Sequence, residues 1–382
     1  MKFLKYKSSF AILAAGVLFA ITFSSANSDG VLTTNAKSVS EKINAQITKY
    51  VTDENFQGTV LVARKGQIIY QAAYGLSDRE KKLKNTLETK FLVGSLTKSF
   101  TAVTVMQLVE DGLLDLNAPI KKYIPTLKNE LAKDLTLHLL LKQQSGLPPS
   151  FDPLTEFENR DVSSKELLEI INRTTLSFAP GTKYEYSNLN YTLCAIAIEN
   201  ATGKSYGQVL QERTFKPLGM KNSGVERLSQ MPANRAKGYS KNDSRIENDE
   251  NVVSYALGSG DIYSTVEDLL KWDKALYGNK FLSEKSKKQL FAGGSEEFGY
   301  YGYGFRIQEY QRGLENKNTG VLARHGGTMD GFMSNFHRYL DDELTVIILG
   351  NIRPFSIREM TFEIKEIALG VEVGKRNRSK LE

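Results

Sequence analysis

Hydrophobic and polar positions alternate at both ends of the chain. A β-rich run at 58–63, a turn at 64–66 and a second run at 67–74 predict a hairpin. Residues 42–50 predict a short amphipathic helix, residues 27–40 a loose polar terminus and residues 76–90 a charged loop. Strand patterns return near the other end, at residues 303–308, 321–325, 331–339 and 344–349.

Between these ends the apolar positions follow helical spacing. The clearest pattern runs from Ser95 to Glu110, where Gly112 ends it. Further helices are expected at 165–172, 190–202, 206–215, 266–277 and 357–369. The simplest packing brings both ends into one antiparallel sheet, flanked by helices and interrupted by an inserted helical domain. We therefore expect an α/β (α+β) fold, with a sheet subdomain at about 41–94 and 297–382 and a helical subdomain at about 95–296.

The first 26 residues have the layout of a secretory signal peptide. Lysines precede an apolar run from Phe10 to Phe23, and small residues follow it up to Ala26. The run is shorter than the roughly 18 residues that span a bilayer, so we expect cleavage after Ala26 rather than a membrane anchor. The mature chain, residues 27–382, is then expected outside the cell or on the extracellular face of the envelope.

Composition excludes several classes of protein. The formal charge of +6 includes the three lysines of the leader. The net charge of the mature chain is therefore about +3. This charge is compatible with an anionic cell wall, but it is too small to indicate a nucleic-acid-binding protein. Cys194 is the single cysteine and lies in an apolar run, which indicates a buried structural thiol. With only three scattered histidines, no zinc-type spacing is present.

The first candidate site is the pair Ser95 and Lys98. Residues three apart on a helix share a face, so the Lys98 amine is expected beside the Ser95 hydroxyl. A serine hydroxyl needs a base to become nucleophilic, and a lysine can be that base when its pKa falls. The alternative is a helix-capping serine with a solvated lysine. The local motif does not decide between them.

Two further segments favour catalysis. Tyr186-Ser187-Asn188 follows a Pro-Gly loop and offers a phenol for proton transfer and an amide that can hold Lys98 or a substrate carbonyl. His325-Gly326-Gly327-Thr328 follows a strand pattern, and its paired glycines permit close approach of a ligand. An N–H of this strand can complete an oxyanion hole with the N–H of Ser95.

These three motifs, in this order, resemble those of the penicillin-recognising serine hydrolases. That family includes class C β-lactamases, D-alanyl-D-alanine carboxypeptidases, D-aminopeptidases and related esterases. Three other stretches, at residues 139–148, 215–220 and 258–269, are also similar to family motifs. The similarity covers about residues 45–370 and implies a β-lactamase/transpeptidase-like fold.

The resemblance implies acyl transfer without a metal or organic cofactor. Ser95 would be the nucleophile, Lys98 and Tyr186 would move its proton, and the N–H groups of Ser95 and Thr328 would bind the oxyanion. Asn188 and the segment from His325 to Thr328 would bind substrate. Whether Lys98 or Tyr186 is the general base stays open at this stage.

His325 narrows the expected substrate. Class C β-lactamases usually carry a lysine at this place, whereas a histidine is mostly neutral at neutral pH. We therefore expect a D-alanyl-D-alanine carboxypeptidase-like or D-peptidase penicillin-binding enzyme. The alternatives are a carboxylesterase, a weak class C-like β-lactamase, or a non-catalytic wall-binding or regulatory protein. The expected partners are a D-amino-acid peptide, β-lactam or ester substrate and the cell wall, with no nucleic acid. The sequence leaves the oligomeric state open.

Overall fold

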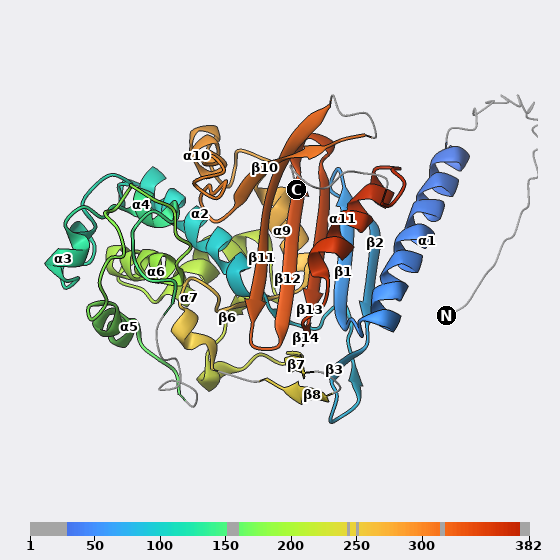
Figure 1. Ribbon diagram of the computed structural model, residues 1–382, viewed down its shortest axis with the longest axis horizontal. Coiled ribbons are helices and arrows are strands. Elements are labelled where there is room, and N and C mark those ends of the chain that lie inside the picture. The colour runs from blue at the N-terminus through green and yellow to red at the C-terminus, as the bar shows by residue number, and fades with distance from the viewer. Residues whose placement is uncertain (1–28, 151–159, 243–244, 250–251, 314–317, 375–382) are drawn as a thin grey trace, which may run out of the picture.

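A six-stranded antiparallel sheet forms the centre of the computed structural model (Figure 1). The structure describes residues 29–150, 160–242, 245–249, 252–313 and 318–374. The predicted signal peptide and its cleavage site lie outside the described residues. The strands lie in the order β10-β11-β12-β13-β1-β2. Their bounds are Gly58–Arg64 for β1, Gln67–Tyr74 for β2, Arg306–Gln311 for β10, Thr319–Met329 for β11, Phe332–Tyr339 for β12 and Leu344–Gly350 for β13.

The two ends of the chain meet where β1 pairs with β13. The register runs without a shift from Gly58 opposite Gly350 to Arg64 opposite Leu344. The prediction of one antiparallel sheet built from both ends is confirmed, and so is the predicted hairpin of β1 and β2. The protein therefore has the mixed α and β fold of the expected class.

Successive residues of the central strands face opposite sides of the sheet. Val60 and Val62 of β1 belong to an apolar cluster that includes residues of α1 (Asp29–Asp53) and α11 (Ile357–Ala368). Leu61 and Ala63 belong to the other, larger cluster. Because both faces are apolar, helices cover both, with α1 and α11 on one side and α9 (Val266–Ala275) on the other (Figure 1).

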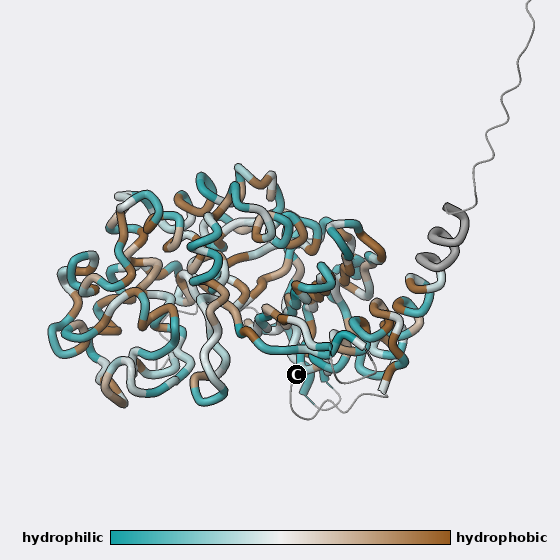
Figure 2. The backbone as a smooth tube through the Cα atoms, turned by 90° about the horizontal axis from the view of Figure 1, so that it is seen from above, coloured by the Kyte–Doolittle hydropathy of each residue, from teal (hydrophilic) through white to brown (hydrophobic). Residues whose placement is uncertain are grey.

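The larger core continues into the helices on the left of Figure 1. Seen from above, hydrophobic and hydrophilic stretches alternate along the tube in both halves, as half-buried elements require (Figure 2). The helices of this part are α2 (Thr97–Glu110), α3 (Asn129–Ala132), α4 (Leu137–Leu141), α5 (Ser164–Ile171), α6 (Asn188–Thr202), α7 (Tyr206–Leu210), α8 (Lys216–Leu218) and α10 (Glu284–Leu290).

Two predictions of local structure are wrong, and a third is incomplete. The helix predicted over residues 42–50 begins at Asp29, so most of the segment expected to be loose is helical. The charged loop at 76–90 contains two short paired strands, β3 (Leu76–Asp78) and β4 (Leu83–Lys84). Their pairing needs little apolar surface, so the hydrophobic pattern misses it.

The prediction of a mostly helical middle misses four short strands. Two of them, β6 (Gly224–Val225) and β9 (Ile262–Ser264), form a small sheet with β5 (Phe91–Leu92), which precedes this region. The other two, β7 (Tyr239–Asn242) and β8 (Arg245–Asn248), form another with β14 (Ile352–Arg353), which follows it. Strands of two to four residues are too short to show alternation. The proposed division into two subdomains remains a prediction.

A buried ion pair fastens α9 to the sheet. Asp273 of α9 accepts from the Arg338 guanidinium of β12, and its second oxygen accepts from the Thr345 hydroxyl at 2.8 Å. Replacing Asp273 by alanine leaves Arg338 buried without its counter-charge.

We therefore expect Asp273→Ala to lower the free energy of unfolding by about 3–5 kcal/mol, measured by urea denaturation. The exposed neighbour Lys274→Ala should change it by no more than about 0.5 kcal/mol. Equal losses in the two variants would show that the pair does not fasten the helix.

Candidate active site

Ser95 stands on a tight turn between a strand and a helix. β5 leads into a 3₁₀ turn at Gly94–Leu96, and α2 begins at Thr97. Gly94 has φ +52°, a conformation that side chains rarely adopt. The turn presents Ser95 at the seam between the sheet and the helices. The helix predicted from Ser95 is therefore confirmed from Thr97 onward.

Lys98 lies one turn further on and is fully buried. Its Nζ is 3.0 Å from Oγ of Ser95, 2.8 Å from Oδ1 of Asn188 and 2.8 Å from the carbonyl oxygen of Ser259. Burial holds the pKa of the Lys98 amine well below its usual range, and the charge of Asp261 partly opposes this.

These contacts fix the orientation of a neutral amine. Such an amine has two N–H donors and one lone pair. The Asn188 amide oxygen and the Ser259 carbonyl can only accept, so they take both N–H groups. The lone pair then faces the Ser95 hydroxyl, which can donate its proton to it. In this arrangement a neutral Lys98 would be able to accept the Ser95 proton.

Tyr186 approaches Ser95 from the other side. Its hydroxyl donates to Oγ of Ser95 at 2.9 Å. Burial raises the pKa of the phenol, so at neutral pH Tyr186 is a proton donor rather than a base. The Lys98 amine lies 4.9 Å from the centre of the Tyr186 ring.

The loop that carries Tyr186 and Asn188 is held by Gln143. The Gln143 side-chain oxygen accepts from the backbone N–H of Ser187 at 2.9 Å and from the Asn190 amide at 2.6 Å. Asn188 is the first residue of α6. The loop and the helix start thus share one buried acceptor, which sets the position of the motif.

Strand β11 passes directly beside the Ser95 turn. A Cβ added to Gly327 would lie 2.1 Å from the carbonyl oxygen of Val93 and 3.1 Å from the backbone nitrogen of Ser95. A Cβ on Gly94 would lie 2.9 Å from the nitrogen of Thr328. The backbone nitrogens of Ser95 and Thr328 are therefore neighbours. Gly327 permits close approach of the protein's own turn, where the sequence suggested approach of a ligand.

His325 lies within the protein rather than in the cavity. It is buried, Nδ1 donates to the carbonyl of Gly326 at 2.6 Å, and Nε2 accepts from the Tyr301 hydroxyl at 2.9 Å. Its ring lies 6.0 Å from that of Tyr186. Burial lowers the pKa of His325 to about 3. Both ring nitrogens thus have hydrogen-bond partners within the protein, and burial favours the neutral ring.

A cavity of about 170 Å³ opens beside Ser95. Of the predicted site residues, Ser95, Asn188 and Thr328 line it, and Gly326 is exposed on β11. Sequence reasoning missed the other residues that line the cavity, which are Ser150, Tyr255, Ala256, Ser259, Gly260, Met329, Asp330 and Arg353.

A signal for part of this set was present. The family-like stretch at residues 258–269 includes Ser259 and Gly260, but Ser259 contacts Lys98 through its backbone carbonyl, which side-chain chemistry does not reveal. In the described residues His, Cys, Asp and Glu form no group of three that could hold a metal ion. No described helix has the length and apolar character needed to cross a bilayer.

Comparison with known proteins agrees with this geometry. A family model described as beta-lactamase matches residues 43–369. The chain therefore belongs to the beta-lactamase family and is a β-lactamase-fold serine hydrolase related to penicillin-binding proteins. The expected family and fold are confirmed.

Individual relatives show how far the similarity extends. The putative penicillin-binding protein PbpX of Bacillus subtilis is 29% identical over 318 residues, which are 81% of this chain and 74% of PbpX. Protein flp of Staphylococcus aureus is 27% identical, and the match covers 77% of this chain but only 59% of flp. The structure of a D-amino acid amidase from Ochrobactrum anthropi matches with a TM-score of 0.73 at 23% identity, covering 89% of this chain and 99% of the amidase, and shows the shared fold.

The close contact at Gly327 gives a first prediction for the site. Gly327→Ala should force β11 away from the Ser95 turn and slow hydrolysis of an acyl substrate by about 100-fold. Gly278→Ala is the control, because a Cβ at this exposed position would meet nothing within 4 Å. A folded Gly327→Ala protein with the wild-type rate would contradict this packing.

The buried His325 gives a second prediction for the site. Long-range ¹H–¹⁵N spectra should show His325 as the neutral Nδ1–H tautomer, unchanged from about pH 8 to about pH 5. Loss of the signal in His325→Gln assigns it. A midpoint near the ordinary value of about 6.5 would mean that the ring is solvated or faces an acid.

Proposed function

We propose that this protein cleaves acyl bonds through a covalent Ser95 intermediate, with Lys98 as the general base. The observation that carries the proposal is the set of three contacts around the buried Lys98 amine. They direct a lone pair at the nucleophile, and burial keeps the amine available in its neutral form. Tyr186 does not compete for this role because burial keeps its phenol protonated.

The reaction follows from these positions. Ser95 Oγ attacks the substrate carbonyl while its proton passes to Lys98. The neighbouring backbone N–H groups of Ser95 and Thr328 stabilise the oxyanion. Tyr186 donates its proton to the leaving group and is reprotonated from Lys98, which restores both side chains. Water then attacks the acyl-enzyme by the reverse proton path.

We infer that the substrate is a D-amino-acid peptide of the cell wall, cleaved in the manner of a D-alanyl-D-alanine carboxypeptidase. Three observations support this substrate. The chain is related to penicillin-binding proteins. It shares its fold with a D-amino acid amidase. The neutral His325 stands where an efficient class C β-lactamase would have a lysine. The signal-like leader supports an exported enzyme that meets this substrate outside the membrane.

The test is a substrate panel with matched serine variants. The purified protein is offered a D-alanyl-D-alanine peptide, a D-amino acid amide, a p-nitrophenyl ester, a cephalosporin and a fluorescent penicillin. We expect turnover of the peptide and a mass increase on Ser95 with the penicillin, both abolished in Ser95→Ala. Ser99→Ala is the control, because Ser99 lies on the same helix and its hydroxyl bonds to Leu96 and Trp272, away from the Ser95 hydroxyl.

Each outcome of the panel has a meaning. Hydrolysis of the ester alone would favour the carboxylesterase alternative, and rapid cephalosporin turnover would favour a β-lactamase. Absence of any Ser95 adduct with every substrate would refute the proposed chemistry and favour the non-catalytic alternative. Full turnover by Ser95→Ala would refute the assigned nucleophile.

A further inference from the structure

A buried carboxylate lies behind the catalytic lysine, although it contacts none of the reacting atoms. Asp261 precedes β9 and has no exposed surface. It ends the turn Gly258-Ser259-Gly260-Asp261, whose Ser259 carbonyl accepts from Lys98. The mechanism described above gives Asp261 no role, and a fully buried acid is costly unless it is paired.

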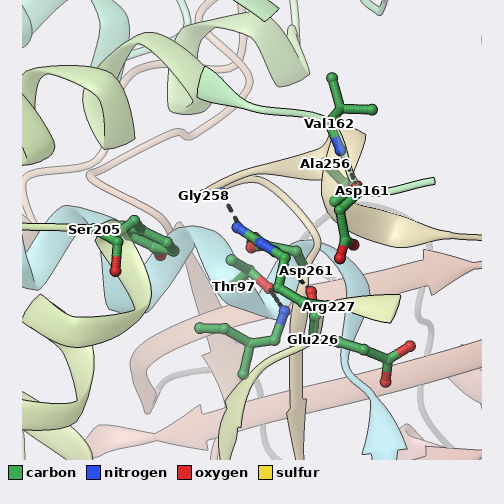
Figure 3. Close-up of polar contacts among 12 residues, drawn as sticks. Thr97, Asp161, Val162, Ser205, Glu226, Arg227, Ala256, Gly258 and Asp261 are labelled. Atoms are coloured by element: carbon green, nitrogen blue, oxygen red, sulfur yellow. Dashed lines mark hydrogen bonds and ion pairs between the residues drawn. The ribbon is translucent and has the colours of Figure 1, made fainter. Parts of the chain in front are cut away.

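The partners of Asp261 fasten both ends of the turn (Figure 3). Its Oδ2 lies 3.0 Å from the Arg227 guanidinium, and its Oδ1 accepts from the backbone N–H of Gly258 at 3.1 Å. Its backbone carbonyl accepts from the N–H of Glu226 at 2.8 Å, and Arg227 donates to the Glu226 carbonyl at 2.6 Å. Asp261 thus joins the start of the turn to the chain that follows β6.

Helix α2 forms hydrogen bonds to the other side of the turn. Lys98 donates to the Ser259 carbonyl, and Thr101, three residues later on the same face, donates to the Gly258 carbonyl at 2.6 Å. Gly258 has φ +68°, and a Cβ there would lie 2.6 Å from Cβ of Ala195 in α6. The turn is therefore packed between two helices, with its Ser259 carbonyl facing Lys98 and its Gly258 carbonyl facing Thr101.

We propose that Asp261 is a positioning residue, which holds the Ser259 carbonyl against the Lys98 amine and supplies the negative charge that faces this amine. The inference rests on the proposed function of Lys98 as the base. Through the turn, Asp261 determines where one Lys98 N–H points and hence where the lone pair points. Through its charge, it limits how far burial weakens Lys98 as a base.

The electrostatic surroundings give the sign of the charge effect. Arg227 faces Asp261 from the segment after β6, Tyr206 from α7 and Lys98 from α2, while Cys194 and Tyr191 lie on α6 behind the turn. Burial raises the pKa of Asp261 to about 6, with Arg227 opposing the rise, so it is ionised at neutral pH. An anion near Lys98 raises the pKa of the amine, against the larger effect of burial.

The variant Asp261→Asn removes the negative charge of the side chain but keeps its shape. The asparagine oxygen can still accept from Gly258, but the negative charge is lost and Arg227 is left uncompensated. Both changes disfavour an ammonium at Lys98. The acid limb of the kcat/KM profile should therefore move to lower pH, by about 1 unit. Asp261→Asn combined with Arg227→Gln removes both charges and should bring the limb part of the way back.

Asp261→Ala removes the hydrogen bond to Gly258 as well. It should lower kcat by about 10- to 100-fold with a smaller change in KM, because the base is misdirected while the cavity remains. The control is Asp268→Asn, a buried acid on α9 that bonds to Asn222, Ser223 and Lys271. It should leave the limb in place, and a thermal melt of each variant shows that it is folded.

The profiles are measured from about pH 4.5 to about pH 9.5 with the substrate that the wild-type protein turns over, a range that includes the pKa of about 6 of Asp261. An unshifted limb in folded Asp261→Asn overturns the inference, and so does an equal shift in Asp268→Asn. These results leave the proposed function intact if wild-type protein still forms the Ser95 adduct. Wild-type protein that forms no adduct contradicts the proposed function itself.

Discussion

The site depends on an amine kept out of water. Lys98 is fully buried, and an ammonium in such a place is costly because it loses its hydration. The protein surrounds it with acceptors but with no carboxylate in direct contact among the described residues, so the neutral form is favoured. In the proposed mechanism this burial is what allows Lys98 to act as the base. Ser95 is then the group towards which its free lone pair is directed.

Several elements of the fold together bury the Lys98 side chain. Helix α2 begins with Thr97 and Lys98. It packs against α6, whose first residue is Asn188. The turn before β9 closes the third side with the Ser259 carbonyl. β11 passes beside the Ser95 turn, at a distance that only a glycine at position 327 allows. Helices, turn and sheet therefore meet around the pair of Ser95 and Lys98.

The sequence predicted the sheet and the reacting pair well, and for identifiable reasons. The strands of the large sheet are five or more residues long, so their period is visible. Ser95 and Lys98 are three residues apart, which geometry alone places together. Tyr186 and Asn188 were linked to that pair by the resemblance of motif order to a known family, and the structure brings them into contact.

What the sequence could not predict involves backbone atoms and long-range contacts. The Ser259 carbonyl has no side-chain signature, and the ionic partner of Asp261 lies 34 residues away. The bonds of the His325 nitrogens to Gly326 and Tyr301 also have no signature in the sequence, and the predicted contact of His325 with substrate stays a prediction. The long α1 was missed in its first half because the polar segment shows no apolar stripe there, and helical propagation does not require one.

The most direct measurement is the titration of Lys98 itself. ¹³C NMR of the lysine Cε, with Lys98→Arg to assign the signal, reports the protonation of this amine in the wild-type protein. The present account predicts a Lys98 signal that is already that of a neutral amine well below the ordinary lysine pKa of about 10.4. A Lys98 that titrates at that ordinary value would be a charged, solvated side chain and would contradict its role as the base.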